Sequence, residues 1–364
     1  MNNPSKHAWD LFLELNHPAQ DVIKGRGLPD LKKKIGDPGR VVWETWKDAA
    51  YEVFLVDGRT PPKWEDYSLD PFLNDIEKRF EPSTALLIAQ LNEDKNRDSL
   101  IQITKAFLSL SHVTFNPKDG TFEVGGGETR MNKSTFDFIV KNELYNPDGI
   151  YKFRNSYLKS PKGQRAPMTF EKESIEAKAM WRKFSVEEIN NSPNTKYYVA
   201  TDKNGEKYGL TSLHIITKDV PNWFWCSFRH KDGPEPSVPS VDNFGLPEQL
   251  KGTFWENYEL SGTQTAFSEA NGKPTLLSDP YIESGFERSS CISCHSLSVA
   301  GPPGTMLRDG GRLLFTLPNV VGNGNIGETV GAPKVEWFLD TNGEENLVQL
   351  DFLYSMSFRA KRKK

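Results

Sequence analysis

The chain has 364 residues, and its 45 Lys and Arg nearly balance 49 Asp and Glu, so its charge gives no general attraction to nucleic acid or anionic lipid. Hydrophobic residues make up 37% and aromatic residues 12%, enough for a substantial core, and 24 prolines and 28 glycines indicate many ordered loops. The longest apolar run, Ala85 to Ala89, has about five residues, far short of the roughly 20 that span a bilayer. We therefore expect a folded, soluble, loop-rich protein with no nucleic-acid partner and no membrane span.

The first 150 residues are predicted to be mainly helical. Apolar residues recur at helical spacing over residues 8–15, 43–53 and 100–110. The second of these stripes contains two tryptophans, and aromatic residues at this spacing are usually core residues, so we expect them to pack inside the protein. A last helix is predicted from Phe136 to Leu144, ending at the turn sequence NPDG.

Beyond about residue 170, apolar residues alternate instead of following a helical period. Segments 174–184, 195–218 and 222–230 predict an antiparallel sheet of at least four strands, with a hairpin turn at Asn204-Gly205. Further strand-like pieces occur at RLLFTL and KVEWFLD. The stretch from Gly233 to Thr305 has little periodicity, and long irregular segments of this kind are often functional.

These patterns predict an α+β fold. We expect a mainly helical part over residues 1–150 and a β-rich part over residues 151–364, in which long ordered loops carry a cofactor. The boundary is weakly marked, so one continuous domain is an alternative.

A cysteine cluster lies near the end of the chain, in the segment SSCISCHSLSVAG. Cys291 and Cys294 are three residues apart, and His295 follows directly, which is the C-x-x-C-H spacing of covalent haem c attachment. One short turn presents two thiols to the two vinyl groups of a porphyrin and places the next imidazole beneath the iron. Cys291 and Cys294 are therefore the predicted thioether sites, and His295 is the predicted metal ligand.

Three other interpretations of the cluster compete with haem attachment. A redox C-x-x-C of the thioredoxin type normally opens a helix beside a βαβ pattern, which the sequence lacks. A structural zinc site needs four ligands, and Cys226 and the scattered histidines offer no second pair. A disulfide between Cys291 and Cys294 is strained at this separation and leaves His295 without a role. The motif thus favours haem.

In these five positions the sequence resembles the c-type cytochromes. More loosely, GRVVWETWKDAAYEVF, GLTSLHIITK, NWFWCSFRH and QLDFLYSMSF are similar to segments of large, poorly characterised bacterial c-type cytochromes, a likeness that spans most of the chain. The resemblance implies a single haem c in a large scaffold and a redox partner. It also implies a periplasmic location, because bacteria attach haem c outside the cytoplasmic membrane. Since the sequence contains no recognisable signal peptide, we expect a mature form.

The ligand on the other side of the iron separates an electron carrier from an enzyme, because Met or His favours electron transfer and an open position lets small molecules bind. The sequence offers four candidates without choosing among them: His214, His230, Met306 and Met356. His230 follows Arg229, and peroxidases use an Arg and a His over haem to polarise and deprotonate peroxide. Adjacent strand residues point to opposite faces, however, so both reach one pocket only if the strand ends or bends there.

We predict a periplasmic mono-haem c-type cytochrome that exchanges single electrons with a protein partner. The alternatives are a peroxidase-like haem c oxidoreductase and a haem-based sensor of a small ligand. The length of the chain motivates both alternatives, because small electron carriers need far fewer residues.

Overall fold

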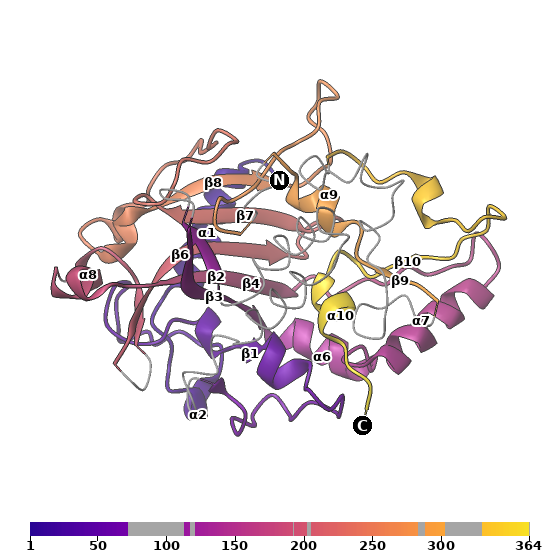
Figure 1. The fold of residues 1–364 in the computed structure, drawn as a ribbon, viewed down its shortest axis with the longest axis horizontal. Coiled ribbons are helices and arrows are strands. Elements are labelled where there is room, and N and C mark those ends of the chain that lie inside the picture. Colours follow the sequence, from indigo (N-terminus) through magenta and orange to yellow (C-terminus); the bar gives the residue numbers. More distant parts are fainter. Residues whose placement is uncertain are drawn as a thin grey trace.

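The computed structural model describes residues 1–71, 113–116, 121–191, 193–201, 205–282, 288–302 and 330–363. Within these residues, eight antiparallel strands form a central sheet in the order β1-β3-β4-β6-β7-β8, with β2 beside β3 and β5 beside β6 (Figure 1). The strands of this sheet are β1 (Lys47–Asp48), β2 (Val113–Asn116), β3 (Thr121–Met131), β4 (Ile175–Lys183), β5 (Val199–Thr201), β6 (Lys207–Thr217), β7 (Phe224–His230) and β8 (Tyr258–Gln264). A separate antiparallel pair consists of β9 (Val299–Ala300) and β10 (Val348–Gln349).

Helices surround this sheet and connect its strands. The α-helices are α1 (Pro4–Leu15), α2 (Val22–Gly25), α6 (Lys133–Lys141), α7 (Pro147–Lys159), α8 (Val186–Asn190), α9 (Cys291–His295) and α10 (Tyr354–Arg359). Shorter turns are the 3-10 helices η1 (Trp43–Thr45), η4 (Pro193–Thr195), η5 (Glu248–Leu250), η6 (Phe254–Asn257) and η11 (Val335–Phe338), and the π-helix η2 (Ala49–Val53). Helices and an antiparallel sheet occur together, which confirms the α+β class.

The predicted sheet is confirmed and is larger than expected. The three alternating segments correspond to β4, to β5 and β6, and to β7, which pair as antiparallel neighbours. The long strand β3 pairs with β4, so the sheet combines strands from both sides of residue 150. β8 lies within the stretch that showed little periodicity. The hairpin turn includes Asn204, and RLLFTL and the stripe over 100–110 also lie outside the described residues.

Three local predictions differ from the structure. Residues 43–53 form η1, β1 and η2 instead of one helix. The Asp48 carboxylate accepts the N–H groups of Ala50 and Tyr51, so a new helix, η2, begins after Asp48. The sequence NPDG opens α7, since Asn146 caps it and Pro147 occupies its first turn. The predicted strand KVEWFLD contains η11, where Val335 is 72% exposed and so does not fit a buried alternation.

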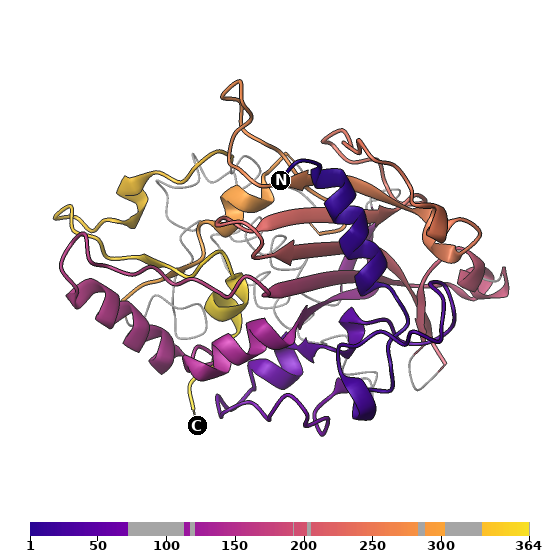
Figure 2. The same ribbon diagram turned by 180° about the vertical axis from the view of Figure 1, so that it is seen from behind.

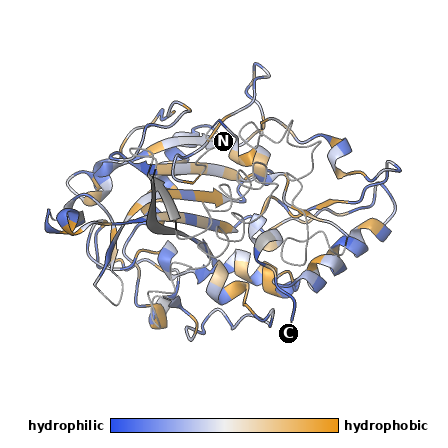
Figure 3. Cartoon of the chain, in the orientation of Figure 1, coloured by the Kyte–Doolittle hydropathy of each residue, from blue (hydrophilic) through white to orange (hydrophobic). Residues whose placement is uncertain are grey.

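One face of the sheet packs against α1, which crosses the strands (Figure 2). The helix begins where the Asn3 side chain accepts the backbone N–H of Lys6, and it buries an apolar stripe. Phe12 of this stripe lies 4.4 Å from Phe228 of β7 between ring centroids, and Trp43 packs against Trp181 on the same side of the sheet. Hydrophobic residues gather along these strands, whereas the outer loops are largely hydrophilic (Figure 3). The tryptophans of residues 43–53 are thus core residues, as predicted.

A cluster of buried charges, here called the Arg130 cluster, also lies on the α1 face, beside β1 and β3. The Arg130 guanidinium lies 2.8 Å from the Glu128 carboxylate and 3.6 Å from that of Asp48. Lys47 lies 3.0 Å from Glu52. The cluster continues through the ion pairs Arg26–Glu52, Arg26–Asp70 and Arg40–Asp70. Each cation therefore has a carboxylate beside it in a buried environment.

Candidate functional site

The C-x-x-C-H motif forms the one-turn helix α9, which packs onto β8. The Ser290 side chain caps the helix by accepting the N–H of Ser293. The side-chain amide of Gln264 in β8 makes two hydrogen bonds to the start of this helix. Its nitrogen donates to Ser290 Oγ at 2.9 Å, and its oxygen accepts the N–H of Ile292 at 3.2 Å. The motif is therefore fixed to a rigid strand rather than carried on a free loop.

The two thiols of α9 lie on one side of the turn, since residues three apart are neighbours on a helix. Neither Cys291 nor Cys294 forms a disulfide. Cys291 is buried, and its thiol donates to the Leu277 carbonyl at 3.1 Å. Cys294 is half-buried, and its carbonyl accepts the Tyr354 hydroxyl at 2.8 Å. Two thiols outside any disulfide and one turn apart are the arrangement that thioether attachment requires.

The His295 imidazole is positioned through its Nδ1 atom. Nδ1 lies 2.8 Å from the Phe352 carbonyl oxygen, which is an acceptor only, so Nδ1 carries the proton and Nε2 keeps its lone pair. The ring packs between Trp225 and Tyr354, with centroids 4.6 Å and 5.0 Å away. Burial lowers the His295 pKa to about 4, so the ring is neutral at neutral pH. Metal-binding histidines characteristically donate their second ring nitrogen in this way.

The backbone that receives His295 adopts an unusual conformation. Asp351 and Phe352 have φ angles of 46° and 70°, in the left-handed region that L-residues rarely occupy. The Asp351 carboxylate holds this turn, because it accepts the Lys218 ammonium at 2.5 Å and the Phe170 N–H at 2.8 Å. Left-handed residues of this kind persist where the surrounding structure determines them, and they cluster at functional sites. Lys218 and Asp351 thus orient the carbonyl that orients His295.

His214 of β6 lies on the face of the sheet opposite α1, here called the α9 face. In the register of the sheet, His214 stands between Lys178 of β4 and Ser227 of β7, and Trp225, which packs on His295, has the same orientation. Burial lowers the pKa of His214 well below its usual value, and the positive charge of Lys178 lowers it further. His214 therefore lies on the same face of the sheet as Trp225, which packs on His295.

His230, another candidate ligand, is engaged away from α9. Both ring nitrogens of His230 are hydrogen-bonded, Nε2 to the Lys196 carbonyl and Nδ1 to the N–H of Asp232. Arg229 points to the opposite face and pairs with Glu259, so the predicted Arg–His pair does not share a pocket.

The sulfur candidates are explained by packing, although Met356 shares its hydrophobic core with Cys291 and Ile292 of α9. Met356 is fully buried in the main hydrophobic core, which explains it without a ligand role. Cys226 also points to the α1 face, where burial raises the pKa of its thiol. Met306 lies outside the described residues.

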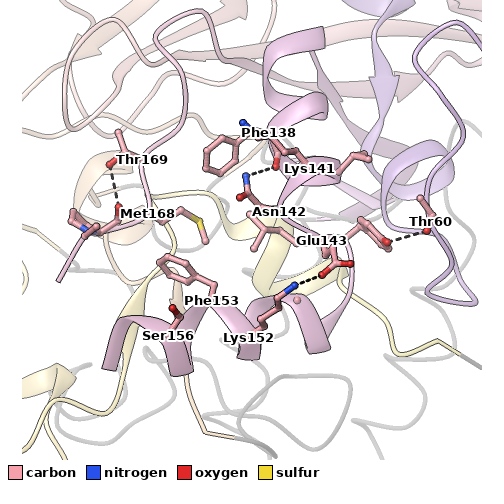
Figure 4. Close-up of a pocket in the computed structure, with 16 residues that line it drawn as sticks. Thr60, Phe138, Lys141, Asn142, Glu143, Lys152, Phe153, Ser156, Met168 and Thr169 are labelled. Carbon is pink, nitrogen blue, oxygen red and sulfur yellow. Dashed lines mark hydrogen bonds and ion pairs between the residues drawn. The ribbon is translucent and has the colours of Figure 1, made fainter. Parts of the chain in front are cut away.

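A pocket of about 860 Å³ lies between α6 and α7 (Figure 4). Phe138, Phe153 and Met168 surround it, and the Lys152–Glu143 ion pair lies at its edge. Its lining contains no cysteine or histidine, so it is separate from the chemistry of α9.

The comparisons with known proteins add no relative. No family model, curated protein or solved structure matches the chain. Among the described residues, no group of three or more His, Cys, Asp and Glu side chains is placed to hold a metal ion, and no helix is long and apolar enough to cross a membrane. The likeness to c-type cytochromes therefore rests on the sequence segments that carry it.

Sequence reasoning found the motif but missed the residues that position it. Phe352, Lys218 and Gln264 are far from α9 in the chain, and their contacts have no local spacing signature. The segment QLDFLYSMSF includes Phe352 and Tyr354, but nothing in the sequence indicated that they contact His295.

Proposed function

We propose that this chain is a mono-haem c-type cytochrome of the periplasm that exchanges single electrons with a protein partner. The observation that carries the proposal is the geometry of α9: two thiols that form no disulfide lie one turn apart, and the next residue is a histidine whose Nδ1–H donates to the Phe352 carbonyl. This donor set fits a cofactor that takes two thioether bonds and one nitrogen ligand.

When bound, haem supplies a one-electron iron couple. The residues of this chain have separate tasks in the proposal. Cys291 and Cys294 would hold the cofactor through two thioether bonds, each S–H adding across one vinyl group. His295 ligates through Nε2, and the hydrogen bond to Phe352 fixes its tautomer and increases its basicity. The rings of Trp225 and Tyr354 restrict the imidazole and shield it from water.

Electron transfer is favoured over a peroxidase-like activity because Arg229 and His230 point to opposite faces of β7. The simplest function without haem is a redox-active dithiol formed by Cys291 and Cys294. That function does not use His295.

The test is an anaerobic redox titration of the haem-loaded protein, followed by rapid mixing of the reduced form with a soluble one-electron acceptor protein. We expect one reversible one-electron transition and fast oxidation, with no turnover of peroxide. Sustained peroxide reduction would replace the carrier with the oxidoreductase alternative. Partner binding that depends on a small ligand, without electron exchange, would indicate a sensor.

A further inference from the structure

The α9 face of the sheet carries a row of polar and small residues directly across five strands. Thr129, Lys178, His214, Ser227 and Gly262 are paired in register from β3 to β8. On the α1 face, the neighbouring row is apolar in its centre, at Ala179, Leu213, Phe228 and Leu260. A polar row in the middle of a covered sheet face is unusual, because buried polar groups cost free energy unless they are bonded.

The α9 end of this row is made of small side chains. Gly262 has no side chain, and a Cβ there would lie 3.2 Å from Leu277 Cδ1, in the segment that leads to α9. The Ser227 hydroxyl is buried and has no hydrogen-bond partner among the described residues. His214 is thus the largest side chain between Lys178 and α9 in this row.

His214 also has the chemical state that iron ligation needs. Burial lowers its pKa well below its usual value, which favours the neutral ring whose nitrogen lone pair can ligate. Its position in the middle of β6, hydrogen-bonded between β4 and β7, gives it a rigid support.

Met180 is the competing residue on the same face, paired in register with Ser212. It is fully buried in a small cluster with Tyr281 and Ile282, so its packing is explained without a ligand role.

We propose that His214 is the second axial ligand of the iron that His295 binds. This inference rests on the proposed haem attachment and extends it, since two histidine ligands close the iron and suit electron transfer.

The experiment compares haem-loaded wild type, His214→Ala, His214→Met and Met180→Leu by optical and electron paramagnetic resonance spectra, with and without carbon monoxide. We expect the wild type and Met180→Leu to be low-spin and unchanged by carbon monoxide. His214→Ala becomes high-spin and binds carbon monoxide, and added imidazole restores the low-spin spectrum. His214→Met keeps a sixth ligand and has the spectrum of His–Met ligation. Circular dichroism of each variant checks that the sheet is folded.

Several results would overturn the inference. A low-spin His214→Ala variant without added imidazole, or opening of the iron by Met180→Leu, shows that another residue ligates. A wild type that is high-spin and binds carbon monoxide shows that His214 does not close the iron. Each of these leaves haem attachment intact, whereas a wild type without covalent haem contradicts the proposed function and the inference together.

Discussion

On the α1 face of the sheet, each buried cation of the Arg130 cluster lies beside a carboxylate, whereas on the α9 face two histidines lie near a cation, Lys178. Arg130 has Glu128 and Asp48 beside it, so this cluster compensates itself. Near α9, burial lowers the pKa of both His214 and His295, and the charge of Lys178 lowers them further. Because the charges of the Arg130 cluster neutralise one another, the cluster needs no bound ion or ligand to be stable. Groups with strongly shifted pKa values, such as the two histidines, are typical of functional sites. Under the proposed function, we expect the Arg130 cluster to affect stability alone and the residues around α9 to affect the haem as well.

The largest effect is expected at Arg130. Arg130→Met removes the cation and leaves two buried carboxylates uncompensated, so the free energy of unfolding should fall by about 3–5 kcal/mol. Denaturant unfolding measures this change, and the haem spectrum of the folded fraction should equal that of the wild type. Lys6→Met, which removes the exposed Lys6–Asp10 pair, is the control and should cost less than about 1 kcal/mol. An altered haem spectrum in Arg130→Met would show that the Arg130 cluster on the α1 face also affects the haem, which would contradict the comparison.

Lys218 should affect both stability and the iron. Lys218→Met breaks the buried pair with Asp351, at a cost of about 2–3 kcal/mol in unfolding free energy. The left-handed turn then relaxes and the Phe352 carbonyl leaves His295, so the imidazole becomes less basic and the reduction potential of the haem-loaded protein rises. Asp351→Asn should also raise the reduction potential, because it weakens the same ion pair. Unchanged potentials in both variants would show that the turn does not position His295.

His230 provides a pH test on the α1 face. Burial lowers its folded-state pKa to about 4, below the unfolded value, so the stability that it contributes is present above about pH 6.5 and is lost as the pH falls toward 4. Asp48, Glu176 and Asp279 have raised pKa values, about 6, 7 and 6, and act in the opposite direction.

The comparison with His230→Phe isolates the histidine from these carboxyl groups. The difference in unfolding free energy between wild type and variant should shrink by about 1–2 kcal/mol between pH 7 and pH 5. A difference that stays constant with pH would mean that His230 is not held neutral by its environment.

The smallest effect is expected at Tyr354. Tyr354→Phe keeps the ring beside His295 but loses the hydroxyl that donates to the Cys294 carbonyl, which should cost about 1 kcal/mol in unfolding free energy. Haem attachment should persist, because the thiols and the His295–Phe352 hydrogen bond are unchanged. Tyr157→Phe removes a comparable hydroxyl contact with Glu345 far from the motif and serves as the control. Loss of haem in Tyr354→Phe alone would give the hydroxyl a larger role than its hydrogen bond to the Cys294 carbonyl implies.

The sequence predicted those features that local pattern encodes. Alternation identified β4, β6 and β7, and the spacing of Cys291, Cys294 and His295 identified the motif. The class of the fold followed from the change of period near residue 170.

Features that depend on side-chain capping were misread. Asp48 accepts two backbone N–H groups and divides the predicted helix, while Asn146 starts α7 where a turn was expected. Both residues use short polar side chains that favour turns and helix starts equally, so their effect depends on the surrounding structure.

The contacts that position the candidate site were beyond sequence reasoning because they join distant segments. His295 meets a carbonyl 57 residues away, and Lys218 meets Asp351 across 133 residues. The positive φ of Phe352 has no sequence signature, since only the tertiary contacts around Asp351 hold that conformation.

The most direct test of the account is the denatured intact mass of the wild-type chain, exported together with a c-type haem maturation system, beside a Cys291→Ser, Cys294→Ser double variant. We predict that the wild type gains the mass of one haem and that the double variant gains none. A wild-type mass equal to the polypeptide alone, or lower by two hydrogens through a Cys291–Cys294 disulfide, would contradict haem attachment.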